Sequence, residues 1–230
     1  MQILHEDNHL IIVNKAPGEI VQGDKTGDPP LSDFVKKYIK EKYNNPGEVF
    51  LGTIHRIDRP VSGIVLFART SKALERMNKM FQEKTIQKTY WAVVKEHPPK
   101  DHDTLIHYLL KNEATNKSKA YLQEHGKALR SELIYRVLAS SDKYHLLEIN
   151  PVTGRHHQIR VQLSTIGSPI KGDLKYGFSR SNPDGSIHLH ARAIRFQHPV
   201  SNIPMFITAP PPDEVLWNYF YKLMNENESA

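Results

Sequence analysis

The chain of 230 residues contains no cysteine. Disulfides, iron–sulfur clusters, thiolate zinc sites and cysteine nucleophiles are therefore excluded. Long apolar runs near the amino terminus are also missing, because the run at residues 10–13 is too short to cross a membrane. Acidic residues stand where a signal peptide carries basic ones. The sequence therefore predicts a cytoplasmic protein with no membrane partner.

The common signatures of nucleotide binding and serine hydrolysis are absent as well. There is no Gly-x-Gly-x-x-Gly, no Gly-Lys-Ser/Thr and no Gly-x-Ser-x-Gly. The chain has thirteen histidines, which could bind a metal ion. The best candidate clusters are His188, His190 and His198, or His156 and His157. Neither cluster has a carboxylate at a third-ligand position, and there is no His-Glu-x-x-His. We therefore expect no metal and no cofactor, with the histidines contacting phosphate or hydrogen-bonded in the core.

Positive charge is concentrated in two blocks of the chain. The formal net charge is +6, but residues 51–100 carry ten Lys and Arg against four Asp and Glu, and residues 151–200 carry seven against two. Clustered cations attract phosphates and release counterions when they bind. A solvated basic face is the ordinary alternative, and composition leaves the two about even. Nucleic acid is thus a candidate partner, ahead of a membrane.

Apolar patterning predicts strands and helices along one chain, with no linker that would separate domains. Strands are expected at residues 9–15, 63–68, 87–95, 129–138, 144–150 and 188–196. Helices are expected at residues 33–43, 71–84 and 158–166 and around 217–223, with Ser32 and either Thr70 or Ser71 as N-caps. Residues 98–119 look irregular, with a hairpin tip or mobile loop at 111–119. A sheet with antiparallel neighbours follows from this order.

One stretch, residues 51–69, carries an acidic side chain between two arginines. Asp58 lies between Arg56 and Arg59 in LGTIHRIDRPVSGIVLFAR. Nearby guanidinium groups favour an ionised carboxylate, which can be a nucleophile or a base. A solvated surface turn is the better explanation of this stretch when it is taken alone. Two further features could belong to the same site. One is Tyr90 on the next strand. The other is the run Gly-Arg-His-His-Gln-Ile-Arg, which opens a helix whose N-terminus and basic side chains could bind an anion.

Several long motifs, in order, resemble those of the RluA-type pseudouridine synthases. IHRIDRPVSGIVLFA is similar to the catalytic motif, and QKTYWAVV is similar to the Lys-x-Tyr motif. VTGRHHQIRVQLSTIGSPIKGDLKYG resembles the Thr-Gly-Arg-x-His-Gln-Ile-Arg motif with its downstream Gly-Asp and Tyr-Gly, and HLHARAIRFQHP and ITAPPP resemble the closing signatures. The match runs from Ile3 to about Asp213. The departures are Ile57, Val61 and Gln162, where the family commonly has Leu, Thr and His.

The resemblance implies an α+β fold with a mixed, largely antiparallel central sheet flanked by helices, and a catalytic cleft. A single catalytic domain is expected over residues 1–230, with a frayed tail from about 224 to 230. The amino-terminal S4-like RNA-binding domain found in many relatives is expected to be absent. RNA binding would then depend on the catalytic domain itself.

The resemblance also implies that specific uridines of structured RNA, ribosomal or transfer, are isomerised to pseudouridine without a cofactor or an obligatory protein partner. Asp58 is the implied nucleophile, attacking either the base or the sugar, and Arg160 is its implied partner. Tyr90 is expected to stack against the base. A stacked base is unreachable, so the uridine must be extruded, and Arg56 is expected to fill the gap.

RNA contacts are expected from five side chains, Arg56, Arg59, Lys88, Arg155 and His157. Phosphate contacts of this kind position the RNA without specifying its sequence. The RNA, the uridine position and the oligomeric state stay open, as do the conformations of the surface loops at 111–119 and 178–187. A noncatalytic RNA-binding or ribosome-assembly protein with the same fold is the main alternative, and a metal-dependent RNA hydrolase is a third.

Overall fold

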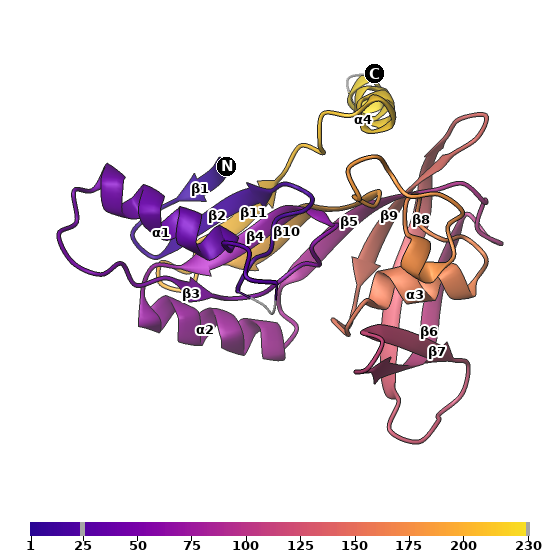
Figure 1. The fold of residues 1–230 in the computed structure, drawn as a ribbon, viewed down its shortest axis with the longest axis horizontal. Coiled ribbons are helices and arrows are strands. Elements are labelled where there is room, and N and C mark those ends of the chain that lie inside the picture. Colours follow the sequence, from indigo (N-terminus) through magenta and orange to yellow (C-terminus); the bar gives the residue numbers. More distant parts are fainter. Residues whose placement is uncertain (24–25, 229–230) are drawn as a thin grey trace. The chain divides into compact units, whose positions relative to one another are not determined.

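The structure, a computed structural model, describes residues 1–23 and 26–228 (Figure 1). The chain divides into two compact units. The first unit comprises Met1–Gln87 and Ala191–Pro210, and the second comprises Lys88–His190 and Pro211–Ala230. Residues 229 and 230 of the expected tail lie outside the described residues. None of the helices in the described part of the chain is long and apolar enough to cross a membrane.

The first unit is organised around a buried strand, β4. Its strands are β1 (Gln2–Glu6), β2 (Leu10–Lys15), β3 (Gly52–Thr53), β4 (Ser62–Ala68), β10 (Leu189–Gln197, in this unit from Ala191) and β11 (Pro204–Thr208). They are ordered β1-β2-β4-β10, with β11 beside β10 and β3 beside β4. β2 runs antiparallel to β4, from Leu10 opposite Ala68 to Lys15 opposite Gly63. All seven residues of β4 are buried, which confirms the prediction of a central strand.

Two helices pack in the first unit, α1 (Leu31–Lys42) and α2 (Ser71–Gln82). The predicted N-cap of α2 is confirmed, because the hydroxyl of Thr70 accepts a hydrogen bond from the Ala73 N–H. The prediction that Ser32 caps α1 was wrong. That helix begins at Leu31, two residues earlier than predicted, and the carbonyls of Ile20 and Val21 accept from the first N–H groups of the helix. Backbone acceptors thus replace a side-chain cap.

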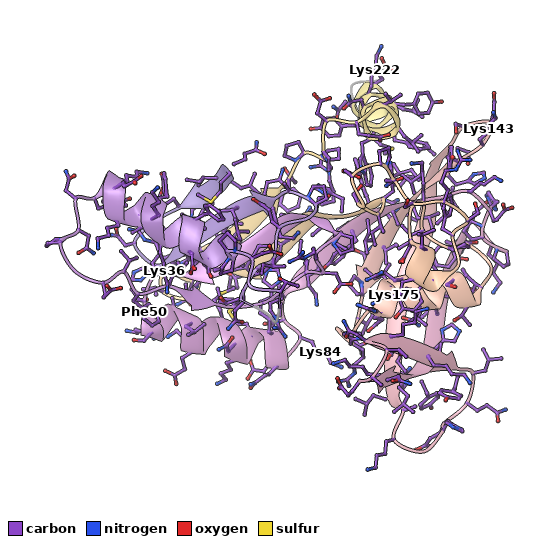
Figure 2. The ribbon with its side chains drawn as sticks, viewed as in Figure 1. Lys36, Phe50, Lys84, Lys143, Lys175 and Lys222 are labelled. Carbon is purple, nitrogen blue, oxygen red and sulfur yellow. The ribbon has the colours of Figure 1, made fainter. Side chains whose placement is uncertain are left out.

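The second unit is an antiparallel sheet covered by a different helix on each face. The strands, ordered β5-β9-β8-β6-β7, are β5 (Gln87–Val94), β6 (His102–Asn112), β7 (Lys117–Tyr121), β8 (Leu129–Ser140) and β9 (His145–Pro151). The helices are α3 (Gln158–Thr165), the short 3-10 helix η1 (Leu174–Tyr176) and α4 (Val215–Glu228), from which Lys222 projects (Figures 1 and 2). Trp91 and Val93 pack against α4, whereas Leu109 packs against Val161 of α3.

The sequence-based prediction missed the strands β1, β3, β6, β7 and β11. Residues 98–119 were expected to be irregular, but β6 and β7 occupy most of this region, and only the hairpin tip was predicted correctly. On the buried face of β6, His107 lies between Leu105 and Leu109, where it hydrogen-bonds Gln162 of α3. A buried polar residue therefore hid the alternation that marks a strand. β1 and β11 are short and were missed as well.

The α+β class and the largely antiparallel sheet with flanking helices are confirmed by this arrangement (Figure 1). Neither the single domain over residues 1–230 nor the catalytic cleft is tested by it, and both stay predictions.

Gly63 is the position in the first unit where a side chain is least tolerable. Its φ is 111°, and an added Cβ would lie 2.4 Å from the carbonyl oxygen of Ala191 in β10. We expect Gly63→Ala to destabilise the protein by more than about 3 kcal/mol, because a backbone clash adds to the unfavourable φ. Gly18→Ala is the matched control: φ is 89° but the space is open, so about 1 kcal/mol is expected. Urea denaturation measures both, and equal losses would contradict the clash.

Candidate active site

Asp58 lies in the loop between β3 and β4, residues 54–61, called here the Asp58 loop. The carbonyl of Asp58 accepts a 3.0 Å hydrogen bond from the Val61 N–H, which closes a turn. Ile57 packs against the apolar core beneath α1. Arg56 is exposed, whereas Asp58 and Arg59 are half-buried. The loop thus presents Arg56 to solvent while its backbone is held by the turn and the core.

Beneath the Asp58 loop lies Lys15, the last residue of β2, which is only 1% exposed. Its Nζ donates to the carbonyl oxygens of Ala16 at 2.9 Å, Glu19 at 2.8 Å and Arg59 at 3.1 Å. The Gly18 N–H donates to the same Arg59 carbonyl at 2.8 Å. All three hydrogens of the ammonium group are therefore used. Lys15 joins the turn after β2 to the residue that follows Asp58.

The environment of Lys15 is unusual for an ammonium group. Burial lowers its pKa to about 8, although the negative charges of Glu19 and Asp58 act in the opposite direction. Asp58 thus has an electrostatic partner in its own unit that the sequence reasoning missed. The signal was present, since a lysine that closes the apolar strand LIIVNK cannot extend into solvent as surface lysines do.

Arg59 also has a structural role within the first unit. Its Nη2 donates to the hydroxyl of Thr26 at 2.9 Å and to the carboxylate of Asp28. The ion pair is partly exposed, so its net contribution to stability is small. It does fix the side chain of Arg59 against residues 26–28. The RNA contact expected from Arg59 stays a prediction.

In the second unit, Arg160 of α3 forms a bidentate ion pair with Asp173. Nε lies 2.7 Å from Oδ2, and Nη2 lies 2.9 Å from Oδ1. Both residues are buried, at 5% and 1% exposure. The guanidinium carbon also lies 5.1 Å from the centre of the Tyr176 ring. Such buried charges are tolerated only with good geometry, so Asp173 and Tyr176 hold the guanidinium in one orientation.

Asp173 and Tyr176 belong to the Gly-Asp and Tyr-Gly pairs downstream of the Thr-Gly-Arg-x-His-Gln-Ile-Arg motif. No role was assigned to these pairs from the sequence. The hydroxyl of Tyr176 accepts from the Ser118 N–H and shares a 2.8 Å hydrogen bond with Nδ1 of His157. Burial raises the pKa of Tyr176. The same ring therefore contacts Arg160, the first turn of α3 and strand β7.

Hydrogen bonds among side chains shape the turn that precedes α3. Oε1 of Gln158 accepts from the Thr153 hydroxyl at 2.8 Å and from the Arg155 N–H at 3.0 Å, and its Nε2 donates to the Glu132 carbonyl at 2.9 Å. His157 then adopts a left-handed conformation, with φ of 53°. Arg155 is exposed at this turn.

Tyr90 and Lys88 lie in β5 on the face opposite Trp91, because alternate residues of a strand share a face. Tyr90 pairs with Ile149 of β9. The Lys88 ammonium nitrogen lies 3.6 Å from the position that a Cβ on Gly154 would occupy. Burial lowers the pKa of Lys88. The structure therefore places Lys88 beside the turn that carries Arg155.

The predicted site residues are divided between the two units. Arg56, Asp58 and Arg59 belong to the first, whereas Lys88, Tyr90, Arg155, His157 and Arg160 belong to the second. The predicted pairing of Arg160 with Asp58 stays a prediction. Each unit has a buried charged residue that holds its site residues. Lys15 binds the Arg59 carbonyl in the first unit, and Asp173 binds Arg160 in the second.

His188, His190 and His198, one of the candidate metal clusters, are buried and are hydrogen-bonded or packed against an aromatic ring. His188 lies 3.0 Å from the Glu214 carboxylate, His198 lies 3.1 Å from the Asp7 carboxylate, and His190 packs edge-on against Trp217. Across residues 1–23 and 26–228, no group of three His, Cys, Asp or Glu side chains is arranged to hold a metal ion.

A family model described as RNA pseudouridylate synthase matches residues 9–165. A ribosomal large subunit pseudouridine synthase C of Vibrio vulnificus is 35% identical over 93% of this chain and 66% of its own length, and that of Vibrio cholerae is 36% identical over 90% and 65%. A tRNA pseudouridine synthase C of Pectobacterium carotovorum is 30% identical over 91% and 58%. The chain thus spans slightly less than two thirds of the length of these relatives.

Solved structures show the same fold. Human RNA Pseudouridylate Synthase Domain Containing 4 superposes with a TM-score of 0.79 at 22% identity, covering 95% of this chain and 92% of that one. Human RNA Pseudouridylate Synthase Domain Containing 1 gives 0.70 at 23% identity, covering 92% and 83%.

Replacing Lys15 with Met tests the buried ammonium group. In the folded protein the pKa of Lys15 is about 8, against an ordinary 10.5. Between these values the unfolded chain binds more protons, so the contribution of Lys15 to the free energy of unfolding rises with pH. The free energy of unfolding of the wild type minus that of Lys15→Met should therefore increase by roughly 2 kcal/mol from about pH 7 to about pH 10.

Urea denaturation across this pH range provides the measurement. Lys36 is exposed on α1 (Figure 2), so Lys36→Met is the matched control and should show a difference that does not change with pH. A flat difference for Lys15→Met as well would mean that the ammonium group is not buried.

Proposed function

Because the chain belongs to the RNA pseudouridylate synthase family, we propose that it converts specific uridines in RNA to pseudouridine. The family identified from the sequence motifs is thereby confirmed. The observation that carries the proposal is the match over residues 9–165, which includes Asp58, Tyr90 and Arg160. In this reaction the bond from uracil N1 to the ribose breaks, the base turns, and a bond from C5 to the ribose forms. C5 then loses its proton to solvent and N1 gains one, so no cofactor is consumed.

Asp58 is the nucleophile in this proposal, and it attacks either the base or the sugar. Three features support a preorganised carboxylate: the Val61–Asp58 turn, the packing of Ile57, and the hold of Lys15 on the Arg59 carbonyl. A group whose backbone is already fixed loses little entropy when it reacts. The charge of Asp58 also acts on the ammonium group of Lys15, so the two groups attract each other.

Arg160 is proposed to pair with Asp58, and Tyr90 is proposed to stack against the uracil. The bidentate bond to Asp173 and the contact with the Tyr176 ring support a fixed role for Arg160, since they determine its orientation in advance. Because this guanidinium group is already held in one orientation, it loses little further mobility when it binds a carboxylate.

RNA is the proposed partner of this chain, and the cytoplasm is its proposed location. The relatives named after the large ribosomal subunit share 32–36% identity with this chain, whereas the relative named after tRNA shares 30%. Large-subunit ribosomal RNA is therefore the first substrate to test and transfer RNA the second. Exposed Arg56 and Arg155 support phosphate or base contacts, and Lys88, His157 and Arg59 complete the proposed RNA-binding set.

Asp58→Asn should bind RNA as the wild type does but lose turnover. We expect at least about a thousandfold lower rate, because an amide cannot form the covalent bond. Tritium release from RNA transcripts labelled at C5 of uridine measures the rate, and filter binding measures the affinity. Asp142→Asn, at an exposed site in the β8–β9 turn, is the control and should keep full activity.

Residual turnover by Asp58→Asn above about 1% of wild type would rule out the nucleophile assignment. No tritium release by wild type from either RNA class would favour the noncatalytic RNA-binding alternative instead.

Arg56→Ala tests base extrusion. If Arg56 fills the gap left by the flipped uridine, its loss should reduce turnover about tenfold or more on a folded RNA hairpin, where unstacking costs a few kcal/mol. On a short unstructured strand containing the same uridine the loss should be small. Lys84→Ala, which removes an exposed cation just after α2, is the control for general loss of charge (Figure 2). Equal losses on both RNAs would make Arg56 a phosphate contact.

A further inference from the structure

The Asp58 loop begins where β3 leaves the edge of β4. β3 pairs Gly52 with Ala68 and Thr53 with Phe67, and the Ile54 N–H continues the ladder to the Leu66 carbonyl at 3.4 Å. The next acceptor on this edge is a side chain. The Leu66 N–H donates to Nε2 of His55 at 3.1 Å. Leu66 is 0% exposed, so water does not replace this acceptor.

The His55 ring is held on a second side by α2. It stacks on Phe81, with the ring centroids 5.3 Å apart and the planes 26° apart. α2 packs closely on β3 at this point, since an added Cβ on Gly52 would lie 2.7 Å from the Leu74 side chain. The imidazole therefore has little freedom to leave the strand edge.

The hydrogen bond also determines the protonation of the ring. A nitrogen that accepts from an N–H must offer a lone pair, so His55 is neutral and carries its proton on Nδ1. His55 precedes Asp58 by three residues, and the Arg59 carbonyl held by Lys15 follows it by one. Asp58 thus lies on a short span that is tied to β4 at one end and to β2 at the other.

We infer that His55 is a positioning residue for Asp58. Its imidazole takes the place of a backbone carbonyl as the acceptor for the Leu66 N–H of β4, and thereby sets the point and direction at which the chain departs towards Asp58. The inference rests on the proposed function, because Asp58 must be the reacting group for its position to matter to the rate. A carboxylate displaced by about 1 Å can lose about a hundredfold in rate while RNA binding is unchanged.

Two substitutions separate the acceptor from the ring. His55→Gln keeps an acceptor oxygen the same number of bonds from Cα but removes the stack on Phe81. His55→Phe keeps a ring against Phe81 but leaves the Leu66 N–H without its acceptor. Phe81→Leu is the matched control, since it removes the stack and leaves the imidazole in place.

Turnover is measured by tritium release from the large-subunit ribosomal RNA or transfer RNA transcript that wild type modifies, with Asp58→Asn as the inactive reference. His55→Phe should lower kcat about thirtyfold with KM within about threefold, whereas His55→Gln and Phe81→Leu should stay within about threefold in both. Amide hydrogen exchange of Leu66 should be faster in His55→Phe than in His55→Gln. Long-range ¹H–¹⁵N spectra of wild type should place the His55 proton on Nδ1.

Activity retained by His55→Phe but lost by His55→Gln would assign the effect to the stack and overturn the inference. Equal losses in both, with equally lowered melting temperatures, would overturn it in favour of a general folding role, and so would a wild-type proton on Nε2. If wild type modifies no RNA while Leu66 exchange and the tautomer are as expected, the proposed function fails but the hold of His55 on the loop stands. The tautomer measurement needs no variant, so a proton on Nε2 would overturn the inference even if His55→Phe does not fold.

Discussion

The Asp58 loop depends on the hydrogen bonds that the buried ammonium group of Lys15 donates. It is buried at the end of β2, and its three hydrogens go to the carbonyls of Ala16, Glu19 and Arg59. Burying an ammonium is costly, and the lowered pKa of Lys15 reflects that cost. The cost is offset by three hydrogen bonds to carbonyl oxygens and by the charges of Glu19 and Asp58. The result is a loop whose backbone is held at the residue that follows Asp58.

The second unit holds the side chain of Arg160 through buried polar contacts as well. Arg160 is buried, and Asp173 binds it through two hydrogen bonds while the Tyr176 ring covers it. Tyr176 in turn contacts Ser118 and His157, so the orientation of Arg160 is coupled to β7 and to the start of α3. In the first unit buried Lys15 holds the backbone next to Asp58, and in the second unit buried Asp173 holds the side chain of Arg160. Preorganisation of this kind is what electrostatic catalysis requires.

Much of the fold was predictable because β2, β4 and β5 are apolar strands and α2 has a clear N-cap. β6 was not predictable, because its buried face includes His107, whose partner Gln162 lies 55 residues further along the chain. The three proposed catalytic residues came from motif resemblance. Their supports did not, because Lys15 reaches Arg59 across 44 residues and Asp173 reaches Arg160 across 13. Local patterns predict elements, whereas such partners depend on tertiary packing.

The central claim is that this chain isomerises uridine in RNA, and its most direct test is a map of pseudouridines in total RNA from cells with and without the gene. One or a few sites, in large-subunit ribosomal RNA or transfer RNA, are expected to disappear when the gene is removed and to return when the wild-type gene is restored. Identical maps with and without the gene would contradict the claim.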